Sequence, residues 1–242
     1  MAKTPEYYDS VTIVSPIAYP MIWQHLVEMS APQLEQGEGK PDYDATFGMR
    51  SDDPVFTTIL RISLEVLREK FPEIVTASAE QIKAASHASM LGAVGSLKQK
   101  HRINFPFQTG AECHAQRAKK GKPPYTWLAD DTILFSTKAG KNKDKTPRQP
   151  VLGTVSSGKP VVFVPPGGVA MNADKFYHGA EAYFKVQFAA GEVANYYVKA
   201  YLNKVVLNGK GTPTPGGASV DEFSQYLGKI TNEAVVDGGL GL

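Results

Sequence analysis

The chain has 242 residues, of which 42% are hydrophobic and 21% charged, a composition typical of a soluble globular protein with a sizeable core. Its apolar runs, such as residues 161–166, are far shorter than the roughly 20 residues of a transmembrane helix, and the N-terminus MAKTPEYYDS has no apolar signal core. Because Cys113 is the only cysteine, no internal disulfide can form. We therefore predict a cytoplasmic protein with no membrane partner.

The net charge of +2 conceals a strong asymmetry along the chain. Residues 1–97 hold 7 Lys/Arg and 13 Asp/Glu, residues 98–148 hold 12 and 4, and residues 149–242 hold 7 and 7, which gives balances of −6, +8 and 0. This concentration of positive charge in the central third favours a polyanionic partner. The alternative, from charge alone, is a pair of solvated loops.

Two strands are predicted in the first part of the chain. Residues 11–19 (VTIVSPIAY) form the first, and Pro16 places it at an edge or a bulge. Residues 32–41 are polar and rich in Gly and Glu, which is typical of a loop. Residues 43–49 (YDATFGM) alternate loosely between apolar and polar side chains, which indicates the second strand.

A helix is predicted directly after these strands. Asp52 or Asp53 is suited to cap it, Pro54 suits its first turn, and the Phe-Pro pair at 71–72 should end it. Its apolar face is formed by residues at helical spacing, namely Val55, Ile59, Ile62, Val66 and Leu67.

A second helix is predicted from the spacing of Ser78 and Gln81, which resembles a capping box. Small and apolar residues continue this helix, namely Ile82, Ala85, Met90 and Leu91. Its end, at residues 97–102, is where the basic part of the chain begins.

The second half of the chain is dominated by β-type patterns. Strands are predicted at residues 125–128, 132–138, 161–164 and 183–188, and residues 193–207 are predicted to form a long strand or a bent pair of strands. The element order predicts an α+β protein that is mainly β, with a barrel or sandwich core and helices inserted between the early strands. We expect residues 1–208 to form this domain, with the insertion near 52–100. Residues 209–242 should form a Gly/Pro-rich linker and a flexible tail that contains a short helix near 221–227.

The late strands each predict one apolar face and one face that mixes tyrosine with lysine. Tyr183 and Lys185 share a face of one strand, and Tyr197, Lys199 and Tyr201 share a face of the other. Tyrosines beside lysines suit base stacking next to a phosphate backbone, worth roughly 1–3 kcal/mol per base for any base. The alternative is that these tyrosines pack under a loop or a partner subunit.

The central basic segment places two further aromatic residues, Tyr125 and Trp127, between the loops 117–122 and 138–148. It shows no recognition helix of the kind that enters a duplex groove, and lysines on Gly-flanked loops suit a flexible single strand. The alternative for Trp127 is a place in the core. The candidate phosphate-binding residues are Lys98, Lys100, Arg102, Lys119, Lys120, Lys122, Lys138, Lys141, Lys143, Lys145 and Arg148.

Motifs of catalysis and of cofactor binding are absent. There is no GxxxxGK[ST] and no GxGxxG after a strand, and the five histidines show no metal-ligand spacing with acids. The acid pairs 52–53 and 130–131 could hold Mg²⁺ if they met, although a helix cap and a turn are the simpler interpretations. We therefore predict a protein that is not an enzyme and has no cofactor or metal.

Four stretches carry a resemblance to a known family. They are SPIAYP, YDATFGM followed by DDPVF, ILFSTKAGKNKDKTPRQPVL, and FYHGAEAYFKVQF with YYVKAYLNKVVLNGKG, in this order over residues 11–211. Together they resemble the OB-fold single-stranded DNA-binding proteins of tailed bacteriophages, a group long filed as a phage domain of unknown function.

This resemblance implies a five-stranded OB-fold barrel with inserted helices and a groove across one face. It also implies sequence-independent binding of single-stranded DNA in phage DNA replication, recombination and repair, in the cytoplasm of the host cell. The residues that carry over by position are the outward aromatics of the late strands and the basic loop, namely Lys138, Lys141, Lys143, Lys145 and Arg148.

Proteins of this family often end in an acidic tail that recruits replication partners, so the resemblance implies contacts with phage or host replication proteins, and a homo-oligomer is a further expectation. The last 22 residues of this chain depart from that pattern, since they hold four acids and one lysine and end in GGLGL. Two alternatives stand beside DNA binding. One is a phage structural or assembly protein whose basic loops contact acidic protein partners, and the other is a metal-dependent nuclease.

Overall fold

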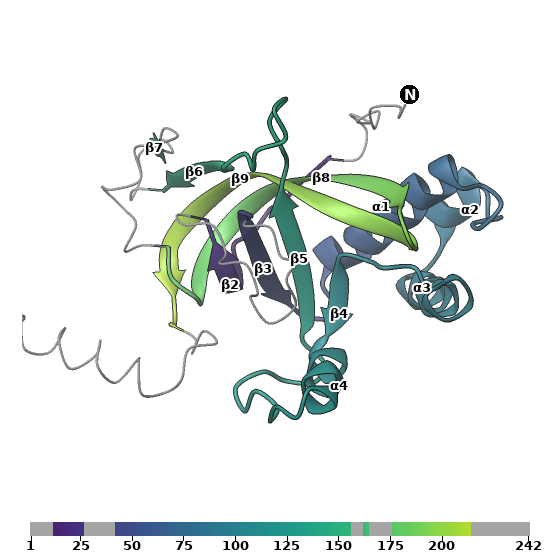
Figure 1. Ribbon diagram of the computed structural model, residues 1–242, viewed down its shortest axis with the longest axis horizontal. Coiled ribbons are helices and arrows are strands. Elements are labelled where there is room, and N and C mark those ends of the chain that lie inside the picture. The colour runs from purple at the N-terminus through teal and green to yellow at the C-terminus, as the bar shows by residue number, and fades with distance from the viewer. Residues whose placement is uncertain (1–11, 27–41, 156–161, 165–175, 214–242) are drawn as a thin grey trace, which may run out of the picture.

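Five strands close into a barrel in the computed structural model, which describes residues 12–26, 42–155, 162–164 and 176–213 (Figure 1). Strand β8 closes the barrel because it pairs with both β2 and β9. The barrel strands are β2 (Tyr19–His25), β3 (Asp44–Met49), β5 (Ile133–Ala139), β8 (Ala180–Glu192) and β9 (Tyr196–Gly211).

Around the barrel the strands follow the order β2, β3, β5, β9, β8 and back to β2. All neighbours are antiparallel except β5 and β9, where Lys138 lies beside Tyr201 in a parallel ladder. A five-stranded barrel of this kind is the OB-fold arrangement. The prediction of a mainly β, α+β protein with an OB-like barrel and inserted helices is therefore confirmed.

Further strands extend the barrel at its edges. One pairs with the outer edge of β8, one with the start of β5, and two form a ribbon that continues from β9. They are, in that order, β1 (Thr12–Val14), β4 (Phe107–Thr109), β6 (Val151–Thr154) and β7 (Val162–Val164).

Aromatic rings fill the barrel, because strand alternation points them inward. Phe47, Phe135, Phe184 and Phe188 are all buried, and ring centroids lie 4.6 Å apart for Phe47 and Phe184 and 6.0 Å apart for Phe135 and Phe188. Thr137 also points inward, and its Oγ1 donates to a β3 carbonyl oxygen at 2.8 Å, so the buried hydroxyl is satisfied. The alternate residues of β5 consequently face outward.

The helical insertion begins with α1 (Pro54–Lys70), which packs against β8 and leads to two further helices beside the barrel (Figure 1). The predicted start is confirmed, since the Val55 N–H donates to Asp53 Oδ1 at 2.7 Å and Pro54 lies in the first turn. The Tyr19 hydroxyl of β2 donates to the same Asp53 oxygen at 2.9 Å. One carboxylate therefore caps the helix and joins it to the barrel.

The second predicted helix is in fact two helices, α2 (Ala79–Ala84) and α3 (His87–His101). The Ser78 and Gln81 capping box is confirmed at the start of α2. The prediction of one continuous helix is wrong because Ala85 has an extended backbone and Ser86 caps a new helix by accepting from the Ser89 N–H.

The prediction of a single strand over residues 11–19 is also wrong. The chain bends between β1 and β2, and Ser15 fixes the bend by donating its N–H to the Phe184 carbonyl and accepting the Phe184 N–H at its hydroxyl, both at 2.9 Å. Strand β2 then continues to His25, beyond the predicted end.

The basic segment departs from expectation as well. Residues 125–128 form a turn rather than a strand, because the Leu128 N–H bonds back to the Tyr125 carbonyl at 3.2 Å. A helix that the sequence pattern did not indicate, α4 (Gly110–Lys119), precedes this turn, so Arg117 and Lys119 are helical and not part of a loop. The helix has a capping box formed by Thr109 and Glu112.

At the C-terminal side, β9 starts at Tyr196 and runs to Gly211, so residues 209–211 belong to a strand and not to the predicted linker. The predicted helix near 221–227 and the rest of the tail lie outside the described residues. None of the described helices has the length and apolar composition needed to cross a membrane.

Candidate nucleic-acid interface

The outer face of β5 has two different surroundings. Leu134, Ser136 and Lys138 alternate with inward residues and so point away from the barrel. Leu134 is fully buried against Cys113 of α4 and Leu128 of the following turn, whereas Ser136 and Lys138 are exposed. The face is therefore covered at the start of β5 and open towards its end.

Three ammonium groups gather at the open end, and we call Lys138, Lys141 and Lys199 the lysine cluster. They belong to β5, to the loop between β5 and β6, and to β9. Partial desolvation, and then the charges of Lys138 and Lys141, lower the pKa of Lys199, so the three groups are close enough to repel one another. A cluster that repels itself when empty is suited to an anion that neutralises it.

Two acids border the lysine cluster. Asp44 lies opposite Lys138 on β3, and its Oδ1 is 3.0 Å from Nδ1 of His25. Burial raises the pKa of Asp42, against the opposing charges of Lys138 and Lys141. Arg148 adds a fourth cation at the base of the loop. Four cations against two acids leave this end of the face positive.

Two tyrosines of β9 lie beside the lysine cluster. Tyr201 neighbours Lys138 in the parallel ladder and is half-buried. Tyr197 is also half-buried, and the Lys199 Nζ lies 4.3 Å from the centroid of its ring. The ring rests over Gly191 of β8, where an added Cβ would collide with it. The face thus combines lysines with a tyrosine ring that the barrel backbone supports.

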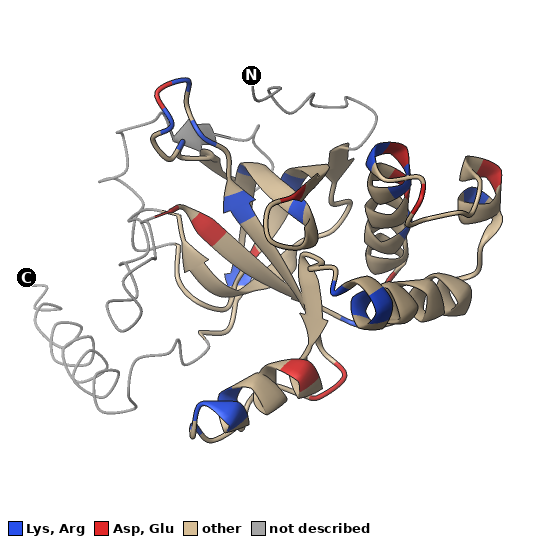
Figure 2. Ribbon diagram, turned by 45° about the vertical axis from the view of Figure 1, so that its right-hand side comes forward, with Lys and Arg blue, Asp and Glu red and all other residues tan. Residues whose placement is uncertain are grey.

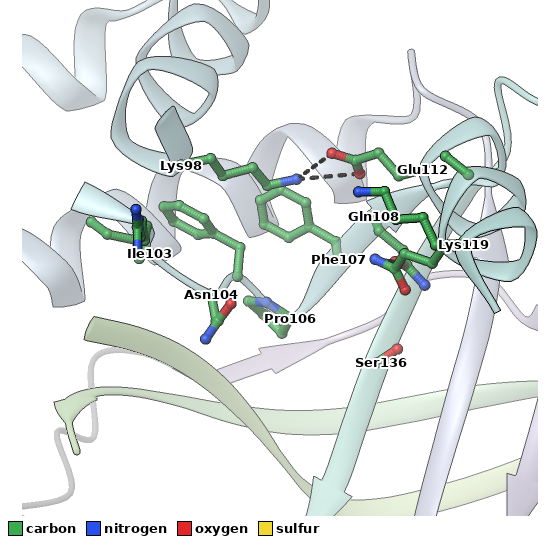
Figure 3. A pocket seen from close by; sticks show the side chains of 13 residues that line it. Lys98, Ile103, Asn104, Pro106, Phe107, Gln108, Glu112, Lys119 and Ser136 are labelled. Carbon is green, nitrogen blue, oxygen red and sulfur yellow. Dashed lines mark hydrogen bonds and ion pairs between the residues drawn. The ribbon is translucent and has the colours of Figure 1, made fainter. Parts of the chain in front are cut away.

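A groove of about 600 Å³ opens to one side of β5, between α3, β4 and α4 (Figure 3). Lys98 and Glu112 meet across it, with Nζ 2.9 Å from Oε1, and so join α3 to α4. Its lining also includes these polar and aromatic residues: Arg102, Asn104, Phe105, Phe107, Gln108, Gln116, Lys119 and Ser136.

The aromatic residues of the basic segment lie on the covered part of the face. Tyr125 and Trp127 pack with Trp23 of β2, at ring-centroid distances of 5.5 Å and 6.0 Å from it, and we call these three the aromatic cluster. The Arg117 guanidinium lies 3.7 Å from the Tyr125 ring centroid. The cluster packs on a small second core that includes Leu134, and each of its rings remains half-buried.

Trp23 had no place among the predicted site residues, although it faces outward next to Thr46 of β3. Its strand was not expected because YPMIWQH shows no clean alternation and contains Pro20. The Thr46 hydroxyl is 3.2 Å from that of Ser136, so the row Trp23, Thr46, Ser136 leads across the sheet from the aromatic cluster to the groove.

The other predicted site residues are spread more widely (Figure 2). Arg148 donates from Nη2 to Asn203 Oδ1 at 3.3 Å and stays beside the lysine cluster. Tyr183 and Lys185 lie on the outer face of β8, opposite Val206 and Lys204. Exposed positions at helix ends and at the tip of the loop are occupied by Lys100, Lys120, Lys122, Lys143 and Lys145.

The acid pairs and the cysteine have structural partners. Asp53 caps α1, Asp52 forms an ion pair with Arg50 at 2.7 Å, and Asp130 lies 3.0 Å from Nδ1 of His114. Burial raises the pKa of the Cys113 thiol, which disfavours the reactive thiolate. Within the described ranges, no group of three or more His, Cys, Asp or Glu residues is arranged to hold a metal ion.

Comparisons with known proteins give matches among solved structures only, since no protein-family model and no curated protein matches the sequence. The chain is similar to the single-stranded DNA-binding protein from bacteriophage Enc34 in complex with ssDNA, at 13% identity and a TM-score of 0.47, over 89% of this chain and 96% of that one. It is also similar to gp2.5, a single-stranded DNA-binding protein encoded by bacteriophage T7, at 16% identity and a TM-score of 0.42, over 96% and 98%.

Proposed function

We propose that the open outer face of β5 and β9 binds single-stranded DNA without regard to sequence. The observation that carries this proposal is the placement of the lysine cluster directly beside Tyr197 and Tyr201 on the outside of an OB-like barrel. In OB-folds, faces and loops of the barrel bind oligonucleotides. Phosphate neutralisation and base stacking are both available there, within a few side chains of each other.

Phosphate binding follows from the electrostatics of the lysine cluster. A phosphate between Lys138, Lys141 and Lys199 relieves their mutual repulsion, and displaced counterions add entropy. Each phosphate engaged on a single strand contributes about −0.7 to the slope of log K against log salt. Binding should therefore be strong at low salt and weaken steeply as salt is added.

Base stacking follows from the placement of Tyr197. Because Gly191 supports the ring from the barrel side, a base can approach from the side where Lys199 now lies. The base displaces the Lys199 ammonium from the ring, and the ammonium then reaches the adjacent phosphate. Only unpaired bases expose their faces in this way, so the same surface discriminates against duplex DNA.

We further propose that the DNA-binding domain extends to the end of β9 at Gly211. The single strands it binds would be those exposed in phage DNA replication, recombination and repair in the host cytoplasm, and the remaining tail would contact replication proteins. These roles rest on the resemblance of the four sequence stretches.

The test is a fluorescence anisotropy titration of labelled oligo-dT and of duplex DNA at several salt concentrations. We expect oligo-dT to bind more tightly than duplex. The triple variant Lys138→Gln, Lys141→Gln, Lys199→Gln should bind about 100-fold more weakly near 0.1 M salt and lose about 2 from the slope, which corresponds to three phosphates.

The matched control removes the same charge from exposed lysines elsewhere, with Lys70→Gln, Lys83→Gln and Lys210→Gln. Duplex binding as tight as that of oligo-dT, or equal losses in the two triple variants, would refute the proposal. Circular dichroism and thermal melting should show that both variants remain folded.

A further inference from the structure

We propose that the groove between α3, β4 and α4 extends the DNA site. A single strand bound on the open face of the barrel continues into this groove and contacts the helices. This inference rests on the proposed function of the open face, and it adds a defined path with its own residues. The ligand of the groove is a phosphate with its base, from the same strand that the lysine cluster binds.

The groove is continuous with the open face. Ser136 belongs to its lining and lies on the outer side of β5, two residues before Lys138. On the other side, Asn104 is hydrogen-bonded to β9, donating its N–H to the Tyr196 carbonyl at 3.0 Å and accepting the Val198 N–H at 2.8 Å. Tyr197 also forms a parallel bridge with Asn104, so a strand stacked at Tyr197 lies next to the groove lining.

The lining matches the chemistry of a nucleotide. Phe105 is half-buried, and its ring centroid lies 5.5 Å from that of buried Phe107, so the ring is supported from one side. The amides of Gln108 and Gln116, which bond to each other at 2.9 Å, offer donors and acceptors to base edges. A volume of about 600 Å³ is within the usual range of ligand sites.

The basic residues at the ends of α3 and α4 differ in two ways that the sequence does not show, namely whether they form an ion pair and whether they line the groove. Lys98 is already paired with Glu112, whereas in the described part of the chain no acid lies within ion-pair distance of Arg102 or Lys119. Lys100 and Lys120 are their neighbours at the ends of α3 and α4, yet neither lines the groove. We therefore assign the phosphate contacts of the groove to Arg102 and Lys119.

A pair of double variants tests this assignment. The first is Arg102→Asn with Lys119→Gln, where asparagine suits the left-handed backbone of position 102, whose φ is 52°. The control, Lys100→Gln with Lys120→Gln, removes the same two charges from the same helix ends. On oligo-dT of about 16 nucleotides, the upper site size of an OB-fold, the first should lose about 25-fold in affinity near 0.1 M salt and about 1.4 in slope.

The control should stay within about twofold of the unaltered protein, because unspecific attraction by distant charges is screened. On an oligo-dT of about 4 nucleotides, which is the lower site size and spans the barrel face alone, both double variants should match the unaltered protein. Suppose that both double variants lose the same affinity for the long strand, and that the lysine-cluster triple variant still binds more weakly than the unaltered protein. This result would refute the groove proposal and leave the proposed function standing. No binding of oligo-dT by the unaltered protein would overturn the proposed function and the groove together.

Photo-crosslinking of the unaltered protein to iodouracil-substituted oligo-dT supplies a measurement that needs no variant. Trypsin cuts after Arg102 and Arg117, so the lining residues Phe105, Gln108 and Gln116 fall in one peptide, residues 103–117. Mass spectrometry should find this peptide crosslinked with the long strand and not with the short one. Its absence from the crosslinked products of the long strand would contradict the proposed path.

Discussion

The covered and the open parts of the outer β5 face share the same kinds of residues but not the same surroundings. At the covered part, aromatic rings and the Arg117 guanidinium pack over Leu134. At the open part, two tyrosines and two further lysines surround Lys138, and the side chains of Lys138 and Lys199 are exposed. The difference lies in α4 and its turn, which supply apolar partners to one part of the face only.

Aromatic residues next to lysines therefore do not define a binding surface by themselves. Tyr125 and Trp127 are stacking candidates in the sequence, yet much of their surface is taken up by each other and by Trp23. The Tyr197 ring packs against the backbone of Gly191 on one side, and the Lys199 ammonium, which a base can displace, lies on the other. The two regions differ in what covers the outward side of the ring, which is another aromatic ring in the aromatic cluster and a lysine ammonium at Tyr197.

The largest expected effect is a loss of stability at the covered part. Leu134→Ala should lower the free energy of unfolding by about 2–5 kcal/mol, because it opens a cavity under the aromatic cluster. Ser136→Ala, two residues along the same face, should change it by less than about 1 kcal/mol. Urea denaturation measures both, and similar values for the two variants would remove the distinction between the covered and the open part.

A smaller effect, on DNA affinity, is expected at the open part. Tyr197→Ala should weaken binding of oligo-dT by about 1–3 kcal/mol, through loss of one stacked base. Gly191→Ala should give a similar loss because the added Cβ displaces the ring, and the double variant should lose no more than Tyr197→Ala alone. Tyr125→Ala, in the aromatic cluster, should instead lower stability and leave the affinity of the folded protein unchanged.

Anisotropy titrations at a temperature where all variants are folded decide between these outcomes. A loss of affinity in Tyr125→Ala with none in Tyr197→Ala would reverse the roles of the two regions. Additive losses in the Gly191 and Tyr197 double variant would show that the glycine acts through something other than the ring.

The smallest expected effect is a pH dependence that comes from Lys199. Its pKa is lowered in the free protein by desolvation and by its two lysine neighbours, and a bound phosphate stabilises the charged form. Binding therefore takes up a proton once the pH approaches the lowered pKa, so affinity for oligo-dT should fall as pH rises towards the ordinary lysine value of about 10.4. Lys199→Arg keeps its charge and should flatten this fall, and an identical pH profile in the variant would exclude Lys199 from the contact.

Local signals predicted much of the fold. The Asp53 cap and the Ser78 capping box depend on residues close in sequence, and the alternation in β8 and β9 is strong enough to assign faces. Helix α4 also carries a local signal, the capping box of Thr109 and Glu112, but it has few apolar residues to reveal a buried side. Its buried side is formed by Cys113, which packs in one cluster with distant Leu134.

The site was less predictable than the fold, because its residues meet only through tertiary structure. The lysine cluster combines two neighbouring parts of the chain with Lys199, from a strand about sixty residues later, and the parallel pairing of β5 with β9 brings them together. The division of the basic residues into those that line the groove and those that do not depends on how α3 and α4 end.

The carboxylate of Asp53 couples the unfolding of the inserted helices to that of the barrel. It caps α1 and accepts the hydroxyl of Tyr19, whose pKa is raised by burial and by this same acid. Melting the inserted helices alone would strip a buried phenol of its partner, and loosening β2 would take the cap from the helix. The two parts are therefore coupled, because opening either one costs the other a hydrogen bond, and this coupling favours their unfolding together.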